Sequence, residues 1–210
     1  MVKYIDFLSK YRPFSVLPKN TLLEGLKHCS IRKLQKHDML YGEGSMEANL
    51  YFVISGNLRC FYDMGDGEVT LSFFKRGEFV INTNAMYLGI PSRFSVEVVR
   101  PSTLLCMPEH VYKKRLEGNL DVCWSALVGF AQHIDLGDLR MRALLFRTAK
   151  EKYKLFLDYY GNDARFFDGN DVASYLNITP DTLSRVKKEA MEEQKNGMVS
   201  KLFSINWGGG

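Results

Sequence analysis

The sequence predicts an α+β protein in which a small antiparallel β-barrel is followed by a long helix and a helix-turn-helix. Three observations indicate this fold. Between residues 31 and 108, glycines recur among short segments rich in aromatic and β-branched residues, which is typical of an all-β barrel or sandwich. From residue 120 onward, apolar residues follow helical spacing. Residues 171–188 then carry the signals of two short helices joined by a tight corner.

The first 30 residues are expected to be helical. Apolar residues from Tyr4 to Tyr11 keep helical spacing, and the pair Arg12-Pro13 then interrupts the pattern. The spacing resumes at Leu22 and ends before Cys29, which predicts a second short helix.

The barrel region is expected to contain short strands separated by turns. The strands are predicted at residues 50–54, 58–62, 68–74, 94–99 and 103–107. The sequence Asp-Met-Gly-Asp-Gly at residues 63–67 is a hairpin signal between two of them. Pro108 ends the strands, and a short helix is expected at residues 109–116.

A single long helix is expected from Leu120 to about Tyr160. Its apolar residues recur at alternating four- and three-residue steps: Cys123, Leu127, Phe130, Ile134, Gly137, Met141 and Leu144. This is the spacing of a coiled-coil seam and favours a parallel dimer, whereas packing against the chain's own barrel is the alternative. The predicted dimer contacts are Cys123, Leu127, Phe130, Ile134 and Met141.

The segment from Asp171 to Lys188 has the spacing of a helix-turn-helix. Asn177 stands at the corner, where it tolerates the left-handed conformation, and Thr179 followed by Pro180 is a good start for the second helix. In this motif the outer face of the second helix enters the DNA major groove. The predicted DNA-binding residues are Thr179, Asp181, Thr182, Ser184, Arg185 and Lys188. The alternative is a pair of packed helices with a solvated outer face.

The charge of the chain permits a polyanionic partner without requiring one. The formal net charge is +4, and from Arg165 onward six cations face six anions. The basic cluster lies earlier, in Arg140, Arg142, Arg147, Lys150, Lys152 and Lys154. We therefore expect much of any sequence-independent attraction to DNA to come from that helical segment.

Cysteines and apolar runs limit the other possibilities. The four cysteines are widely spread without a CxxC pair, so neither a disulfide framework nor a zinc site is expected. The sequence contains no apolar run of membrane-spanning length and no secretion signal. A cytoplasmic protein with no membrane partner is the expectation.

The order of these parts resembles the Crp/Fnr family of bacterial transcription regulators. Residues 39–44 and 50–59 are similar to the family's early barrel strands, residues 77–80 resemble the start of its ligand cassette, and residues 171–188 resemble its recognition motif. The resemblance implies a jelly-roll (double-stranded β-helix) barrel of the cyclic-nucleotide-binding type and a winged helix-turn-helix. It also implies a homodimer, a pseudo-palindromic double-stranded DNA operator and contact with RNA polymerase.

The resemblance also implies that the chain is divided into three functional regions. They are an effector-binding barrel domain with N-terminal helices at 1–118, a dimerisation helix and hinge at 119–160, and a DNA-binding domain at 161–210. The wing is expected to be reduced, because the sequence after the recognition helix is short and supports one strand at most, at residues 198–205.

The ligand cassette departs from that of the family's cyclic-nucleotide binders. Ile81-Asn82 stands where those proteins have Gly-Glu, and Arg93 is followed by Phe94-Ser95 rather than by Ser or Thr and then Ala. In the family's cyclic-nucleotide binders, the glutamate of this pair holds the ribose hydroxyl. Without that carboxylate cyclic AMP is not expected, and the effector is an unidentified small molecule. Clustered cysteines for an iron–sulfur centre are also absent from the sequence. The candidate effector-binding residues are Asn82, Tyr87, Arg93, Ser95 and Trp124.

The sequence does not favour an enzyme. His37 is the only histidine between residues 31 and 107, so a cupin-type metal site cannot be assembled inside the barrel. The GxSxG, P-loop and HExxH motifs are also missing. The alternative to a DNA-binding regulator is a ligand- or protein-binding sensory module whose DNA-binding half is degenerate. The neutral charge from Arg165 onward and the missing wing would favour this alternative.

Overall fold

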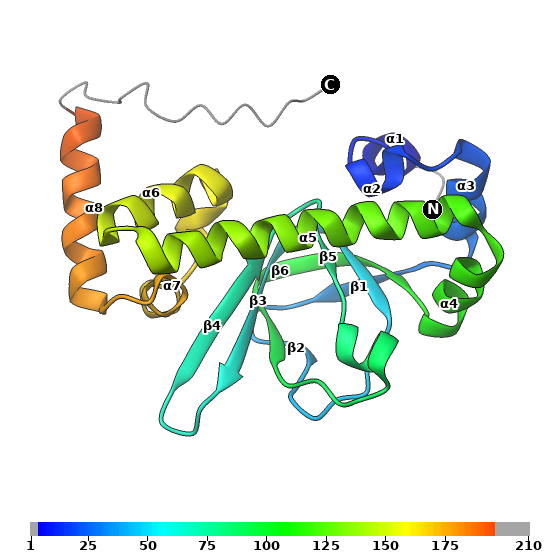
Figure 1. Cartoon of the computed structure of the whole chain (residues 1–210), viewed down its shortest axis with the longest axis horizontal. Helices are drawn as coiled ribbons and strands as arrows, with labels where there is room; N and C mark the ends of the chain where they lie inside the picture. The colour runs from blue at the N-terminus through cyan, green and yellow to red at the C-terminus, as the bar shows by residue number, and fades with distance from the viewer. Residues whose placement is uncertain (1–3, 196–210) are drawn as a thin grey trace.

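The computed structural model describes residues 4–195 (Figure 1). It begins with three short helices, α1 (Ile5–Leu8), α2 (Arg12–Ser15) and α3 (Lys19–Lys27). The Arg12-Pro13 pair does not only interrupt the first helix, as expected, but begins α2. A proline is accepted there because the first turn of a helix needs no backbone N–H partner. These helices pack on the outside of the barrel, where the ring of Phe14 lies 4.8 Å from that of Phe52.

The barrel is a six-stranded antiparallel sheet. Its strands are β1 (Ser30–Leu34), β2 (Met39–Tyr41), β3 (Leu50–Asp63), β4 (Glu68–Phe74), β5 (Phe79–Val80) and β6 (Ser95–Met107). The order is β1-β6-β3-β4, with β2 paired to β6 and β5 paired to β3. A short π-helix, η2 (Asn84–Leu88), lies between β5 and β6. The predicted α+β class with an antiparallel barrel is confirmed.

Two pairs of predicted strands are each a single strand. The strands expected at 50–54 and 58–62 join in β3, and those expected at 94–99 and 103–107 join in β6. Gly56 marks a bulge rather than a turn, because the β3–β6 register shifts on both sides of it. Its φ of +91° and its close approach to the backbone at Ser102 both require glycine.

The predicted long helix is divided in two. After α4 (Glu109–Gly118), helix α5 (Leu120–Phe146) crosses the barrel, and α6 (Ala149–Tyr160) begins after a break at Arg147 and Thr148 (Figure 1). Thr148 and Glu151 form a capping box that starts α6. The expectation of one helix to Tyr160 was wrong because the apolar spacing continues across this break. None of the described helices is both long and apolar enough to cross a lipid bilayer.

The last described elements are the 3-10 helix η3 (Gly161–Phe166), α7 (Gly169–Leu176) and α8 (Pro180–Lys195). Their apolar side chains form one cluster with α6 and with Phe73 of β4. The C-terminal helices are therefore joined to the barrel by a shared core. The strand expected at 198–205 and the wing lie outside the described residues.

Candidate nucleic-acid interface and effector site

The corner between α7 and α8 has the geometry of a helix-turn-helix. Asp168 caps the start of α7 by accepting a hydrogen bond from the backbone N–H of Asn170 (2.8 Å). At the other end Asn177 adopts the left-handed conformation, with φ 50° and ψ 57°, and the N–H of Ile178 donates to the carbonyl of Ala173 (3.1 Å). An asparagine in place of glycine thus forms the corner, as the sequence predicted.

The start of α8 is capped by Thr179. Its hydroxyl oxygen accepts a hydrogen bond from the backbone N–H of Thr182 (3.2 Å) and donates to the Thr182 hydroxyl (2.9 Å). Leu183 and Val186 are buried on the inner side of the helix. Two of the predicted DNA-binding residues, Thr179 and Thr182, are therefore hydrogen-bonded to each other at the helix start.

The outer side of α8 carries the other four predicted DNA-binding residues. Asp181, Ser184, Arg185 and Lys188 are exposed and, at spacings of three and four residues, lie on one face. Arg185 and Lys188 form no ion pair with any residue that the structure describes. A guanidinium in this setting can pair with both acceptors of a guanine edge, and lysine and serine can hold phosphates.

A small cavity adjoins this face. It has a volume of about 190 Å³ and is lined by Gly169, Asn170, Pro180, Leu183, Ser184 and Lys187. The first turn of α7 therefore lies next to a lysine of α8. Lys187 was not among the predicted contacts, because its neighbour Lys188 occupies the outward position of the helical pattern.

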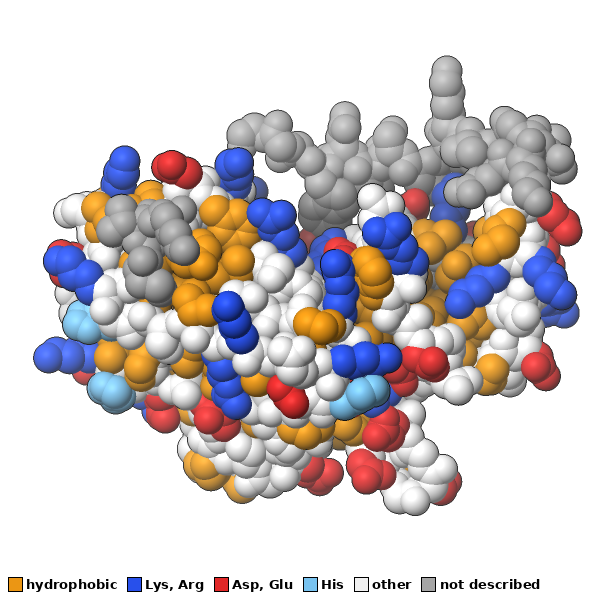
Figure 2. Space-filling view, turned by 180° about the vertical axis from the view of Figure 1, so that it is seen from behind, with side chains coloured by type: hydrophobic (Ala, Val, Ile, Leu, Met, Phe, Trp, Pro, Cys, Tyr) orange, Lys and Arg blue, Asp and Glu red, His pale blue; other side chains and the backbone are white. Residues whose placement is uncertain are grey.

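The basic cluster predicted to attract DNA is only partly available. Lys and Arg side chains are scattered over the face that Figure 2 shows, among acidic and apolar ones. Arg140 donates to the carbonyls of Thr70 (3.0 Å) and Tyr175 (3.4 Å), and Lys152 is 8% exposed and donates to the carbonyl of Leu176 (3.2 Å). These two cations hold the helices together, which corrects their expected role.

Further members of this cluster are partly neutralised. Arg142 pairs with Asp138 (2.7 Å) and Arg147 with Glu151 (3.5 Å). Both pairs join residues four apart and are exposed to solvent, so they contribute little to stability. Any attraction to DNA from this segment is weaker than the count of its cations suggests.

The candidate effector-binding residues Asn82 and Ser95 are used in the barrel wall. Asn82 is fully buried; its amide donates to the carbonyl of Ser45 (3.2 Å) and its side-chain oxygen accepts from the N–H of Ala85 (3.2 Å). The buried hydroxyl of Ser95 accepts from the N–H of Glu43 (3.0 Å). Both side chains therefore attach the loop between β2 and β3 to the barrel.

The other three effector candidates lie nearer the surface. Arg93 is exposed on the loop before β6, and Trp124 is 58% exposed on α5. The ring of Tyr87, in η2, lies 5.4 Å from that of Phe130 of α5. Thus the structure groups Asn82 with Ser95 and connects Tyr87 to the long helix, and their role in binding an effector stays a prediction.

The inside of the barrel is filled by apolar and aromatic side chains. They include Leu58, Phe74, Val80, Val96, Val98 and Leu104, together with Tyr41, Tyr51, Cys60 and Cys106. The hydroxyl of Tyr41 is buried with no hydrogen-bond partner among the described residues. Burial raises the pKa of the Cys60 thiol to about 12, so this side chain is an unreactive thiol.

A second cavity lies outside the barrel, between α3 and α4. It has a volume of about 510 Å³ and is lined by His28, His110, Val111, Lys114, Arg115, Gly118 and Asn119. None of the sequence-predicted effector residues lines it. Among the residues that the structure describes, no three His, Cys, Asp or Glu side chains are placed to hold a metal ion.

Helix α5 presents an apolar stripe to solvent. Its exposed members are Leu120, Trp124, Leu127, Ile134, Met141 and Leu145. Of the predicted dimer contacts, Leu127, Ile134 and Met141 lie on this stripe. Cys123 instead donates to the carbonyl of Leu116 (2.8 Å), and Phe130 packs on Tyr87. One side of α5 therefore packs against the chain's own elements while the stripe is left uncovered by the described residues.

Comparison with known proteins agrees with this architecture. Residues 31–119 match the family model of the cyclic nucleotide-binding domain. No curated protein matches the chain by sequence. FixK2 from Bradyrhizobium japonicum is 19% identical, with a TM-score of 0.69, and the match covers 84% of this chain and 89% of FixK2.

Two further solved structures show the same arrangement. A protein from Eubacterium rectale assigned to the Crp/Fnr family of transcriptional regulators is 14% identical, with a TM-score of 0.68, over 91% of this chain and 90% of that one. The catabolite activator protein of Thermus thermophilus is 21% identical, with a TM-score of 0.54, over 87% of this chain and 88% of that one.

Together, these matches define first a class of protein, in which a cyclic-nucleotide-binding-type barrel is followed by a helix-turn-helix. More particularly, the chain has the Crp/Fnr fold, and the match extends over most of its length. The fold expected from the sequence resemblance is thereby confirmed.

Proposed function

We propose that this chain is a dimeric DNA-binding transcriptional regulator of the Crp/Fnr type. The observation that carries the proposal is the outer face of α8, where Ser184, Arg185 and Lys188 are exposed beyond a capped helix-turn-helix corner. A degenerate DNA-binding half would not need to keep Asn177 in the left-handed conformation or cations on this face. The family resemblance extends the proposal to contact with RNA polymerase.

The dimer is proposed from the stripe on α5. Its members from Leu120 to Leu145 lie three, four or seven residues apart, which keeps them on one side of the helix. Isolated chains rarely leave such a row of large apolar side chains in water. Pairing two α5 helices would place two copies of α8 on one side of the dimer. Recognition helices about 34 Å apart read the half-sites of a pseudo-palindromic operator.

The effector is proposed to be a small molecule other than a cyclic nucleotide. Asn82 stands where a ribose-binding carboxylate would be needed. Both the nitrogen and the oxygen of its side-chain amide form hydrogen bonds within the barrel wall. The side chain of Arg93 is exposed to solvent. Titration calorimetry with cyclic AMP and cyclic GMP is expected to show no binding, and saturable binding of either would overturn this part of the proposal.

The DNA-binding proposal is tested by selection from a random DNA library followed by mobility-shift titration. Arg185→Ala is expected to weaken binding to the selected sequence by about 10- to 100-fold, because one bidentate base contact is lost. Arg142→Ala, which removes an exposed α5 cation already paired with Asp138, is the control and should weaken binding much less. If no sequence is enriched, or if the two variants behave alike, the alternative sensory module without DNA binding is favoured.

A further inference from the structure

Two consecutive residues of strand β4 belong to two different hydrophobic cores. Phe74 belongs to the core of the barrel. Phe73 is 2% exposed and lies in the core of the C-terminal helices, where its ring stacks on Phe167 with a centroid separation of 4.1 Å. The rings of Tyr175 and Tyr160 lie 5.6 Å and 5.8 Å from that of Phe73. Phe73 and Phe74 are adjacent along the backbone of β4, so these two residues join the barrel core to the core of the C-terminal helices.

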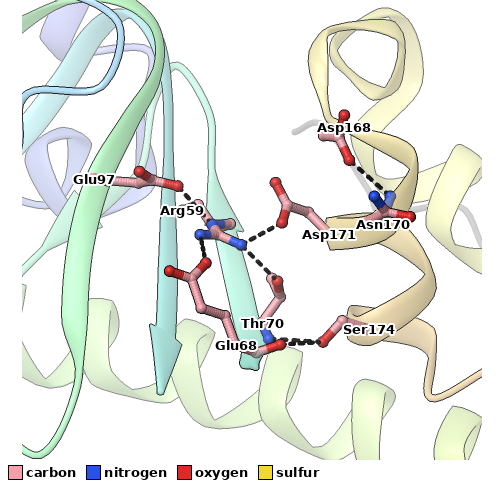
Figure 3. A network of polar contacts seen from close by, with 8 residues as sticks. All are labelled: Arg59, Glu68, Thr70, Glu97, Asp168, Asn170, Asp171 and Ser174. Carbon is pink, nitrogen blue, oxygen red and sulfur yellow. Dashed lines mark hydrogen bonds and ion pairs between the residues drawn. The ribbon is translucent and has the colours of Figure 1, made fainter. Parts of the chain in front are cut away.

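A buried arginine joins the same two parts of the molecule. Arg59 of β3 is 4% exposed, and its guanidinium pairs with Glu97 of β6 (2.8 Å), with Glu68 of β4 and with Asp171 of α7 (Figure 3). We call these four residues the Arg59 cluster. Asp171 is its only member from the helix-turn-helix, and 112 residues separate it from Arg59.

The free edge of β4 is completed by a side chain of α7. β4 is an edge strand, so one side of its backbone lacks a neighbouring strand. The hydroxyl of Ser174 accepts from the N–H of Thr70 (3.0 Å) and donates to the carbonyl of Glu68 (3.2 Å) (Figure 3). Helix α7 is therefore attached to β4 by specific polar contacts as well as by apolar packing.

The turn that follows β4 is attached to α6. Lys75 donates to the carbonyl of Tyr159, and its ammonium lies 3.8 Å from the centre of the Tyr159 ring. The hydroxyl of Tyr159 in turn donates to Glu78. Contacts along β4 and just beyond its end thus hold the unit formed by α6, α7 and α8.

We propose that β4 and the Arg59 cluster couple the packing of the barrel to the position of the helix-turn-helix. The inference rests on the proposed function and names how that function is regulated. A change inside the barrel that displaces Phe74 would move Phe73 and loosen α7 from β4, which changes the placement of α8. Such coupling works only through the difference in free energy between the attached and the released states.

The composition of the Arg59 cluster makes the attachment reversible. Removing the last partner of a buried charge is strongly destabilising, because the charge is left uncompensated. Here Arg59 keeps Glu68 and Glu97, both from the barrel, when Asp171 leaves. Burial and the neighbouring carboxylates also raise the pKa of Asp171 against the effect of Arg59.

The test is hydrogen–deuterium exchange, followed by mass spectrometry, on the full chain without DNA. Ser174→Ala and Asp171→Ala are each expected to speed the exchange of α7 amides by about tenfold or more, because each removes polar contacts to β4. Asp121→Ala, which removes an exposed first-turn carboxylate from α5, is the matched control and should leave α7 exchange unchanged.

Transmission through the barrel core is tested with Phe74→Leu. This variant is expected to speed α7 exchange, whereas Leu26→Ala, a truncation in the separate core beneath the N-terminal helices, should leave α7 exchange unchanged. Unchanged α7 exchange in Ser174→Ala and Phe74→Leu, or an equal effect of Leu26→Ala, would overturn the proposal. If Phe74→Leu does not fold, Leu104→Ala, a truncation elsewhere in the same barrel core, takes its place.

The outcome is separable from that of the DNA-binding proposal because no DNA is present in this experiment. Coupling that persists while Arg185→Ala has no effect on DNA binding would refute the proposed function alone. Loss of operator binding in Arg185→Ala with unchanged α7 exchange in the β4 variants would refute the coupling alone.

Discussion

Asn177 sets the angle between the two helices of the corner, because it is the residue that adopts the left-handed conformation there. A β-branched side chain is poorly tolerated at such φ and ψ values, whereas glycine is not restricted. We predict that Asn177→Val lowers the free energy of unfolding by about 1–2 kcal/mol and that Asn177→Gly leaves it within about 0.5 kcal/mol of wild type. Urea denaturation measures both, and equal stability of the two variants would contradict this explanation of the corner.

Glu78 provides a prediction about pH. Burial raises the pKa of its carboxyl, although the hydroxyl of Tyr159 and the N–H of Lys75 donate to it. The folded protein therefore binds this proton more tightly than the unfolded chain does. The Glu78 contribution to stability is complete below the ordinary glutamate pKa and is lost as pH rises through the raised value.

The experiment compares wild type with Glu78→Gln by urea denaturation between about pH 4 and pH 8. The variant does not titrate at this position, so its free energy of unfolding should improve relative to wild type as pH rises. Glu117→Gln, an exposed change on α4, is the control, and its difference from wild type should stay constant. A constant difference for Glu78→Gln as well would show that burial does not perturb this carboxyl.

At the scale of the elements, the course of β3 depends on the bulge at Gly56. A Cβ atom at this position would overlap the Ser102 hydroxyl oxygen and lie 2.5 Å from the Pro101 carbonyl oxygen. Gly65, in the hairpin, also has positive φ (82°), but no described atom lies within 4 Å of the place that a Cβ would take there. We predict a loss of about 1 kcal/mol for Gly65→Ala and about 3 kcal/mol or more for Gly56→Ala. Thermal unfolding of both variants tests this, and similar losses would mean that the contacts of Gly56 relax easily.

The corner between α7 and α8 was predictable from the sequence, whereas the bulge in β3 was not. Asn177, Thr179 and Pro180 act through their own backbone conformation and nearby hydrogen bonds, so the corner was predictable from local signals. A glycine in a bulge and a glycine in a turn look alike in sequence, which is why the sequence predicts the end of a strand at Gly56. The bulge depends on the neighbouring strand β6, which is distant along the chain.

Long-range contacts also explain what sequence reasoning missed in the candidate site. Lys152 was predicted to attract DNA, but its exposure is set by α7, whose last carbonyl it caps. Arg59 gave no signal at all, since a single arginine in a strand is ordinary until Glu68, Glu97 and Asp171 are brought around it. For the effector residues, the sequence identified departures from the family pattern, and the structure added that Asn82 and Ser95 are hydrogen-bonded within the barrel wall.

For the whole molecule, the proposal depends on dimer formation through α5. Ile134 lies near the middle of the exposed stripe and is 70% exposed in the single chain. In a paired seam this side chain would be surrounded by the partner helix, and a charge at such a position is costly because it must be desolvated without a partner. Gln132 is also exposed on α5 but does not belong to the stripe, so Gln132→Glu adds the same charge outside the seam.

We therefore predict that Ile134→Glu converts a dimer into a monomer, as measured by light scattering or sedimentation, while Gln132→Glu remains dimeric. The folded chain should survive in both variants, because Ile134 contributes little to the core of one protomer, and circular dichroism checks this. The monomer should also bind a two-half-site operator about 100-fold or more weakly, since the linked second recognition helix no longer raises the effective concentration of the first. A monomeric wild type would show that the chain does not dimerise, and a dimer unaffected by Ile134→Glu would show that it dimerises through another surface. Either result would leave the spacing of the two recognition helices without a structural basis.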